Sequence, residues 1–167
     1  MTSRRYAVGM LISKPVRAVR SYTQKLVAPP HVVFPLLCPV REAEWARGWD
    51  PIHVWSSGGV IEEDCVFTTT GEPAAVWVVT RLDPSDFFVE MVKVTPGVTA
   101  CRLTIQLEPD EEGSAARVCY RHTSLGPAGD EFVARFTDSH YASFMREWEQ
   151  ELNHFLSTGQ KLSPGQS

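Results

Sequence analysis

Residues 127–159 read PAGDEFVARFTDSHYASFMREWEQELNHFLSTG and form the longest helical pattern in the chain. Pro127 suits the first turn of a helix, and Gly159 suits a left-handed helix end. At about 100° per residue, one stripe of this helix is largely apolar. It holds Val133, Thr137, Tyr141, Phe144, Trp148, Leu152 and Phe155. We therefore predict one continuous C-terminal helix, about 45 Å long, whose stripe needs a large apolar surface to cover it.

The segments before this helix have the pattern of an antiparallel sheet. Residues 16–27 alternate like a strand, and Ala28-Pro29-Pro30 ends it because proline cannot donate to a strand ladder. Pro35 and Pro39 then forbid one continuous helix and favour two short ones. Turn residues separate further predicted strands, which span residues 52–55, 60–70, 75–82, 87–94, 98–107 and 115–125.

The sheet and the C-terminal helix each have one apolar face to bury. In the strand at residues 98–107, Cys101, Leu103 and Ile105 alternate with polar residues, which indicates a sheet with one wet face. Two stacked sheets with the helix outside would leave the aromatic stripe uncovered. We therefore predict an α+β helix-grip arrangement: a seven-stranded antiparallel curved sheet wrapped around the C-terminal helix, with two short helices after the first strand.

The chain of 167 residues is long enough for one core. We expect a single domain over residues 15–159, a flexible lead-in at residues 1–14 and a disordered tail at residues 160–167. The apolar run in the lead-in is too short to span a bilayer, and no small-residue cleavage site follows it. We expect no stable membrane insertion.

Composition excludes several classes of protein. The net charge is −4, and Lys and Arg are scattered, which argues against nucleic acid as a partner. The cysteines at positions 38, 65, 101 and 119 lack the spacing of a zinc site. We expect reduced, buried cysteines in a cytoplasmic protein that has no metal and no cofactor. Whether it is a monomer or a homodimer stays open.

Several segments carry a family resemblance. They are PHVVFPLLCPVRE at residues 30–42, Trp45, Gly48-Trp49, DCVF at 64–67, WVVT at 77–80 and Leu152-Asn153. In this order of elements, the chain resembles the START-like or SRPBCC superfamily, and within it an uncharacterised bacterial subgroup of polyketide cyclase-like proteins. The resemblance covers about residues 16–159. It implies a cavity between the sheet and the terminal helix, but not one function, since the superfamily includes lipid carriers, cyclases and chaperone activators.

Strand parity indicates which side chains line such a cavity. His122 and Tyr120 share one face of the last strand and are predicted to point toward the helix. There they could orient a ligand carbonyl or hydroxyl, or transfer a proton; alternatively, both are core residues bonded to each other or to backbone. The full predicted ligand-binding set is Trp77, Leu103, Ile105, Val118, Tyr120, His122, Tyr141, Phe144 and Trp148.

Arg81 is the third candidate for a catalytic role, together with Glu90 on the adjacent strand. If the two face each other inside the cavity, they could anchor a carboxylate or activate a water; otherwise they form a solvated cross-strand pair. Parity weakens the neighbouring pair Arg41-Glu42, because adjacent strand residues point to opposite faces. The orientation of His53, Arg81 and Glu90 stays open.

Trp45 and Trp49 flank the turn that closes the short helices onto the sheet. We interpret them as packing at the mouth of the cavity, with direct ligand contact as the alternative. Three functions are then compatible with the sequence. The first is binding of a small hydrophobic molecule of the lipid, polyketide or isoprenoid type; the second is a cyclase or dehydratase-like enzyme that uses the cavity His and Tyr; the third is an interaction module resembling chaperone activators.

Overall fold

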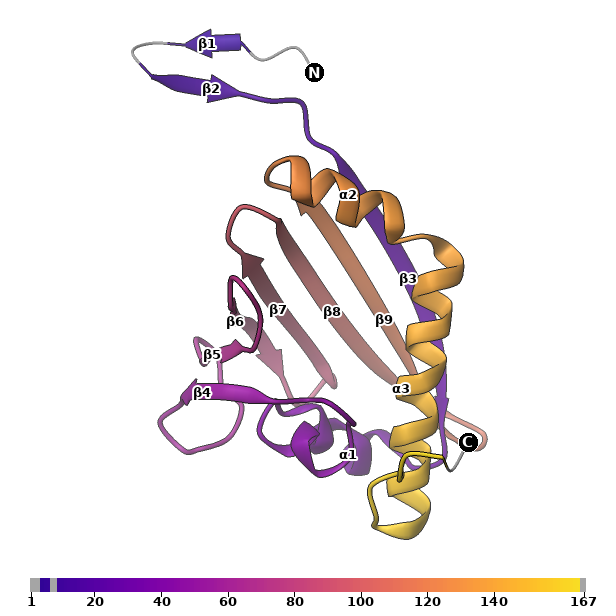
Figure 1. The fold of residues 1–167 in the computed structure, drawn as a ribbon. Helices are drawn as coiled ribbons and strands as arrows, with labels where there is room; N and C mark the ends of the chain where they lie inside the picture. The colour runs from indigo at the N-terminus through magenta and orange to yellow at the C-terminus, as the bar shows by residue number, and fades with distance from the viewer. Residues whose placement is uncertain (1–3, 7–8, 166–167) are drawn as a thin grey trace.

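A seven-stranded antiparallel sheet forms the body of the protein, as the sequence predicts (Figure 1). The computed structural model describes residues 4–6 and 9–165. The strands run in the order β3-β9-β8-β7-β6-β5-β4. Their bounds are β3 Arg17–Leu26, β4 Pro51–Trp55, β5 Val66–Thr69, β6 Ala75–Asp83, β7 Phe88–Thr95, β8 Thr99–Asp110 and β9 Gly113–Ser124. Strand β5 is shorter than the strand predicted at residues 60–70. Strands β8 and β9 extend further toward the turn between them than the predicted strands at 98–107 and 115–125.

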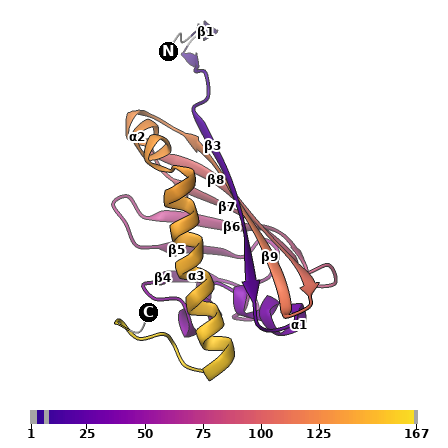
Figure 2. The same ribbon diagram turned by 90° about the vertical axis from the view of Figure 1, so that its right-hand side faces the viewer.

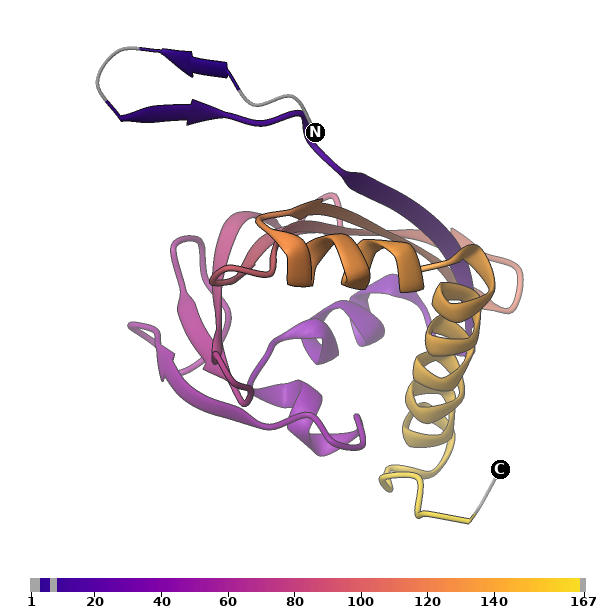
Figure 3. The same cartoon turned by 45° about the horizontal axis from the view of Figure 1, so that its top comes forward.

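The helices lie on the concave side of the sheet (Figures 2 and 3). After β3 come three short turns of helix: α1 Pro30–Val33 and the 3₁₀ segments η1 Phe34–Leu37 and η2 Arg41–Glu44. The C-terminal elements are α2 Pro127–Arg135, which crosses one end of the sheet, and α3 Asp138–Thr158, which runs beside β3. A long terminal helix held against a curved sheet confirms the predicted helix-grip fold.

The prediction of one continuous helix over residues 127–159 is wrong, because the helix breaks at Phe136 and Thr137. Thr137 is extended, with ψ 164°, and its Oγ1 accepts a hydrogen bond from the backbone N of His140 at 3.2 Å. It therefore caps α3 rather than lying on an apolar stripe. The Arg20 side chain holds the junction, since its Nε donates to the Phe136 carbonyl at 3.0 Å.

The break rotates the buried face of α3 relative to the predicted stripe. Met145, which the stripe omits, is fully buried, whereas Phe144 is 44% exposed. Tyr141 and Leu152 are buried as expected. The face that packs on the sheet is therefore centred on Tyr141, Met145 and Leu152, and Phe144 lies at its edge.

Backbone contact sets the position of α2. A Cβ atom at Gly129 would collide with the Val98 carbonyl oxygen in the β7–β8 turn and would lie 2.5 Å from the Ser124 Oγ. Only glycine lets the helix approach the sheet this closely. The helix α2 therefore covers one end of the concave face.

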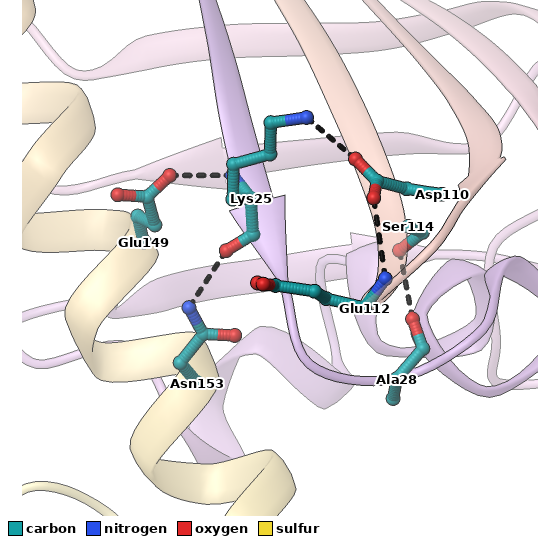
Figure 4. Close-up of polar contacts among 7 residues, drawn as sticks. All are labelled: Lys25, Ala28, Asp110, Glu112, Ser114, Glu149 and Asn153. Carbon is teal, nitrogen blue, oxygen red and sulfur yellow. Dashed lines mark hydrogen bonds and ion pairs between the residues drawn. The ribbon is translucent and has the colours of Figure 1, made fainter.

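Side chains of α3 form hydrogen bonds with backbone N–H and C=O groups at the outer edge of β3, which has no neighbouring strand (Figure 4). The Asn153 Oδ1 accepts from the Val27 backbone N at 3.0 Å, and its Nδ2 donates to the Lys25 carbonyl at 2.8 Å. The Glu149 carboxylate accepts from the Lys25 backbone N at 2.6 Å. In the interior, Gln24 Nε2 donates to the Met145 carbonyl at 3.1 Å. These contacts fix the distance between α3 and the sheet.

The two ends of the described chain differ. At the N-terminus, β1 Arg4–Tyr6 and β2 Met10–Ile12 pair only with each other and project from the body (Figures 1 and 3). At the C-terminus, Leu162 is buried, and Lys161 Nζ donates to the Ala43 carbonyl at 3.2 Å. For these two residues the structure shows packing where the sequence predicts a disordered tail. Residues 1–3, 7–8 and 166–167 lie outside the described part.

The four cysteines are free and buried, as predicted. In the described chain no helix is long and apolar enough to cross a bilayer.

Candidate functional site

A cavity of about 250 Å³ lies between the concave face of the sheet, the segment around η2, and α3. It opens to solvent on one side. Its walls are mostly aromatic and aliphatic, with a few acidic groups. The lining residues are Glu42, Ala46, Arg47, Gly48, Trp49, Trp77, Met91, Leu103, Tyr120, Phe144, Glu147, Trp148 and Glu151.

The sheet supplies the floor of this cavity. Trp77, Met91, Leu103 and Tyr120 come from four neighbouring strands, β6 to β9. Leu103 is the register partner of both Met91 and Tyr120, whereas Trp77 pairs with Lys93, two residues from Met91. The Trp77 ring stacks on Phe67 with centroids 5.3 Å apart, so its plane is fixed by packing. The floor is therefore rigid and apolar except for the Tyr120 hydroxyl.

Two tryptophans from the short helices close the side walls. Trp49 meets the Trp77 ring edge-on at 5.8 Å, and its Nε1 donates to the Pro39 carbonyl at 2.7 Å. Trp45 is fully buried behind the wall and stacks on Trp148 of α3 at 5.7 Å. For Trp45, which is buried in the core beside the cavity, packing at the mouth stays a prediction. Trp49, in contrast, lines the cavity itself.

Glu42 is the least expected residue in the cavity. It belongs to η2, where its backbone N donates to the Cys38 carbonyl at 2.8 Å and its own carbonyl accepts from Ala46 at 2.7 Å. These bonds direct its side chain inward, and the residue is 8% exposed. Within residues 9–165 the carboxyl group has no hydrogen-bond or ion-pair partner. Burial raises the pKa of the Glu42 carboxyl well above its usual range.

The Tyr120 hydroxyl is the second polar group of the cavity without a partner among the described side chains and backbone. Burial raises the pKa of Tyr120 well above 10, and neighbouring Cys101, Tyr141 and Glu42 add to that rise. The phenol therefore stays protonated. Tyr141 behaves differently, because its hydroxyl donates to the Val118 carbonyl at 2.6 Å. Tyr141 is thus a satisfied core residue, and Tyr120 is a group that faces open space.

At the rim, α3 presents Glu147 and Glu151 one turn apart. Glu151 is buried and accepts from Arg47 twice, from the side-chain Nε at 2.8 Å and from the backbone N at 3.0 Å. Glu147 is exposed. The only basic residue of the lining, Arg47, is therefore already neutralised by one of the three carboxyl groups.

His122 lies near the cavity but does not line it. Its ring packs against Phe132 and Phe136 of the α2 region, with centroids 4.8 and 4.5 Å away, and against Tyr120 at 5.9 Å. Its Nδ1 is buried and has no partner in the described structure. Burial, together with the charge of Lys93, lowers the pKa of His122 to about 4, so the ring is neutral at pH 7.

The other predicted site residues divide between the cavity and its surroundings. Trp77, Leu103, Tyr120, Phe144 and Trp148 line the cavity. Ile105, Val118 and Tyr141 are buried in the core beside it, and the structure does not bring them to the cavity surface.

Arg81 and Glu90 are register partners, but their side chains do not meet inside the cavity. Arg81 is exposed, lies over the Phe88 ring at 4.7 Å, and approaches Asp83 at 3.7 Å. The Glu90 carboxylate accepts from Thr80 Oγ1 at 2.8 Å. Between them they form surface contacts rather than an internal anchor.

His53 is exposed and stacks on Trp55 at 3.9 Å. Across the described ranges, no group of three His, Cys, Asp or Glu residues is arranged to hold a metal ion.

The sequence interpretation missed Glu42, Met91, Glu147 and Glu151. The alternation argument against Glu42 applies to strands, whereas η2 is a short 3₁₀ turn, so strand parity does not determine where its side chain points. The sequence offers no clear signal, because two acidic residues, Glu42 and Glu44, lie between the apolar segment Leu36–Val40 and Trp45.

Several solved structures have a fold similar to that of this chain. Norcoclaurine synthase from Thalictrum flavum, in complex with dopamine and hydroxybenzaldehyde, has a TM-score of 0.62 at 12% identity, over 86% of this chain and 89% of that chain. An uncharacterised protein from Rhizobium leguminosarum has a TM-score of 0.58 at 14% identity, over 86% and 97%. Ara h 8.0201 has a TM-score of 0.57 at 10% identity, over 87% and 99%.

Neither a protein-family model nor a curated protein matches the sequence. At these identities the structural likeness shows the fold alone. The chain therefore has the helix-grip fold, an architecture in which a neighbour such as norcoclaurine synthase holds small molecules.

Proposed function

We propose that this protein binds one small, largely apolar molecule in the cavity between the sheet and α3. The observation that carries the proposal is a cavity with apolar walls in which the buried Glu42 carboxyl group and the half-buried Tyr120 hydroxyl make no hydrogen bond among the described residues. Buried polar groups in a folded protein are nearly always hydrogen-bonded, and binding sites are the usual exception. A ligand that carries one polar end would satisfy both groups.

The size of the cavity narrows the ligand class. A volume of about 250 Å³ corresponds to about eight water molecules at roughly 30 Å³ each. Ligand sites commonly measure about 300–1,000 Å³, so this one is small. It suits a molecule of one or two rings, the size of the dopamine and hydroxybenzaldehyde held by norcoclaurine synthase. Among the expected ligand types, a compact polyketide or monoterpene-like molecule fits better than a long-chain lipid.

The test is a binding screen with one- and two-ring probes such as indole and 2-naphthol. Trp49, Trp77 and Trp148 line the cavity, so a bound probe should change tryptophan fluorescence, and it should raise the melting temperature because it binds only the folded state. Ala46 lines the cavity and is buried, so Ala46→Leu should fill the space and abolish both signals. Ala43→Leu, on the exposed side of η2, should bind like the wild type.

A result in which no probe binds, or in which the Ala46→Leu and Ala43→Leu variants bind equally well, would overturn the proposal. A second pair of variants, Tyr120→Phe and Tyr141→Phe, tests which tyrosine hydroxyl contacts the ligand. Tyr120→Phe removes the unpartnered hydroxyl and should weaken binding of hydroxylated probes only. Tyr141→Phe removes a hydroxyl that is bonded to Val118 and should lower stability without changing binding.

Catalysis is the second candidate function, and Glu42 favours it. A carboxyl group kept protonated by burial, next to a phenol, has the composition of a general acid for a carbonyl substrate. In this version Glu42 and Tyr120 replace the predicted His122, which packs away from the cavity. Loss of turnover in Glu42→Gln, with retained binding, would distinguish an enzyme from a carrier.

Two further assignments belong to the proposal. We propose membership of the START-like superfamily, since the chain has the helix-grip fold and each of the resembling segments at residues 30–42 and 77–80 contributes one residue, Glu42 and Trp77, to the cavity. We propose a cytoplasmic location, since all four cysteines are free.

A further inference from the structure

We propose that the cavity is selective for an organic ammonium ion: the Glu42 carboxylate holds the positive charge, and the apolar body of the ligand lies against the tryptophan and tyrosine rings. This inference rests on the proposed function and names the ligand class of the same cavity. It begins from the charges of the lining. Three carboxyl groups, from Glu42, Glu147 and Glu151, face one cation, Arg47.

The Arg47 side chain does not compensate Glu42. Its guanidinium and its backbone N both bond Glu151, which is 7% exposed and therefore forms a partly buried ion pair of its own. Glu42 and Glu147 are left without a basic partner in the described residues. A bound cation would correct this excess of negative charge, and a bound anion would increase it.

Glu42 points to a ligand independently of the charge count. It is more than nine-tenths buried, its carboxyl group lines the cavity, and nothing in the described chain bonds to it. A buried carboxylate is stable only when it is paired, so in the empty cavity the group takes up a proton. That is the reason for its raised pKa. A ligand ammonium group would replace this proton with a paired charge.

The walls suit the rest of such a ligand. Aromatic side chains surround the space, and their faces attract ammonium ions; they belong to Trp49, Trp148, Tyr120 and Phe144. The protein already contains one such contact, since Lys93 Nζ lies 4.9 Å from the centre of the Trp77 ring. An amine on a single ring would reach Glu42 while its ring stays among the aromatic side chains.

The groups around Glu42 define how its protonation responds to a ligand. Tyr120 faces it from β9, Glu147 and Glu151 from α3, and Arg47 from the loop after η2. Lys93 on β7 lies over Trp77 and does not line the cavity. A cation beside Glu42 favours the ionised carboxylate, so it lowers the pKa of Glu42. Below the raised pKa of the empty site, binding of an ammonium ion must therefore release a proton.

The first experiment compares three ligands of one shape and different charge by calorimetry at about pH 7. They are phenethylamine, which is protonated, 2-phenylethanol, which is neutral, and 3-phenylpropionate, which is anionic. We expect phenethylamine to bind at least about tenfold more tightly than 2-phenylethanol, and 3-phenylpropionate to bind most weakly. Glu42→Gln should reduce the advantage of the amine over 2-phenylethanol to less than about twofold.

Glu44→Gln is the matched control for Glu42→Gln. Glu44 lies on the same short helix but is exposed and pairs with Arg41 at 3.3 Å, so this change should preserve the preference for the amine. Repeating the titration near pH 6 in two buffers of different ionisation enthalpy counts released protons. We expect proton release when phenethylamine binds to the wild type, and none for 2-phenylethanol. This count needs no variant and holds even if Glu42→Gln fails to fold.

The outcomes separate the two proposals. Equal binding of amine and alcohol, or tighter binding of the anion, overturns the selectivity for cations and leaves the small-ligand function in place. An amine that binds without proton release overturns the proton uptake by Glu42 in the empty cavity. An amine preference that survives Glu42→Gln overturns the assignment to Glu42. If none of the three ligands binds, and indole and 2-naphthol also fail, the proposed function itself is wrong.

Discussion

Two buried ionisable side chains, Glu42 and His122, have pKa values that burial shifts away from their ordinary ranges. Glu42 and His122 are both buried, and in both cases the neutral form is stabilised. Their surroundings differ: Glu42 faces a cavity, whereas His122 is enclosed by phenylalanine rings. The same physical effect therefore leaves one neutral group at the cavity surface and makes the other a source of acid sensitivity.

For His122 we predict a defined pH dependence of stability. Its pKa falls from the ordinary 6.5 to about 4 in the folded protein. Between these values the unfolded chain binds a proton that the folded chain does not. The free energy of unfolding therefore decreases as the pH falls through this window, by up to about 1.4 kcal/mol per pH unit, and is unaffected above it.

His122→Phe should remove this component. Urea unfolding at about pH 7, 6 and 5 should show the wild type losing stability relative to the variant as the pH falls. His31→Gln, at an exposed position, should follow the wild type. Parallel curves for wild type and His122→Phe would show that the imidazole is protonated in the folded state.

At the scale of elements, the attachment of α3 to β3 depends on a few side chains. Asn153 bonds the backbone of Lys25 and Val27 in the place of a neighbouring strand. Asn153→Ala should lower the free energy of unfolding by about 1–2 kcal/mol, because two hydrogen bonds are lost and their backbone partners must find water. Gln150→Ala, on the exposed side of α3, is the control and should change stability little. Equal stabilities in chemical denaturation would contradict this role.

Because α2 lies so close to the sheet, we expect a Gly→Ala change in this helix to have the opposite effect on stability from the usual one. Gly→Ala within a helix normally stabilises it by about 1 kcal/mol. At Gly129 the added methyl group meets the Val98 carbonyl and the Ser124 Oγ, so Gly129→Ala should instead destabilise by about 1–3 kcal/mol. The double change Gly129→Ala with Ser124→Ala should recover only part of the loss, because the backbone contact remains. A stabilised Gly129→Ala in thermal unfolding would mean that α2 can move away without cost.

The elements also show where sequence reasoning works. Alternating apolar residues and turn signals predict the strands, since each strand has one buried face and ends at residues that disfavour a ladder. The helix break was not predicted because Tyr141, Phe144 and Trp148 keep helical spacing with Val133 on the far side of it. The local signal is Thr137-Asp138, an N-cap followed by an acidic first turn, within an otherwise uninterrupted pattern.

The cavity was only partly predictable for a related reason. Parity assigns Leu103 and Tyr120 to the concave face because strands have a fixed period. In residues 76–82 neither face is clearly polar, so parity does not place Trp77. The short helical turns have no such period over four residues, so the inward direction of Glu42 depends on tertiary packing. Glu151 likewise needs Arg47, which is distant in sequence, to explain its burial.

At the scale of the whole molecule, the N-terminal hairpin is separable from the body. The strands β1 and β2 pair only with each other, and the main sheet begins at Arg17. We predict that a chain starting at residue 15 keeps its cooperative unfolding, with a melting temperature within about 3 °C of the full chain. It should also bind the same ligands. Loss of cooperative unfolding in calorimetry would show that residues 1–14 belong to the domain.

The hydrogen bonds from Glu149 and Asn153 to β3 affect whether this edge of the sheet can pair with a strand of another molecule. An edge strand with free N–H and C=O groups can pair with a strand of another chain, and many proteins protect such edges. Here α3 occupies these groups at the C-terminal end of β3 with its own side chains. The opposite edge, β4, is short and begins with a proline, but it carries the exposed Ile52 and Trp55. Sheet-to-sheet aggregation, when the protein is stressed, is therefore expected to begin at β4 rather than at β3.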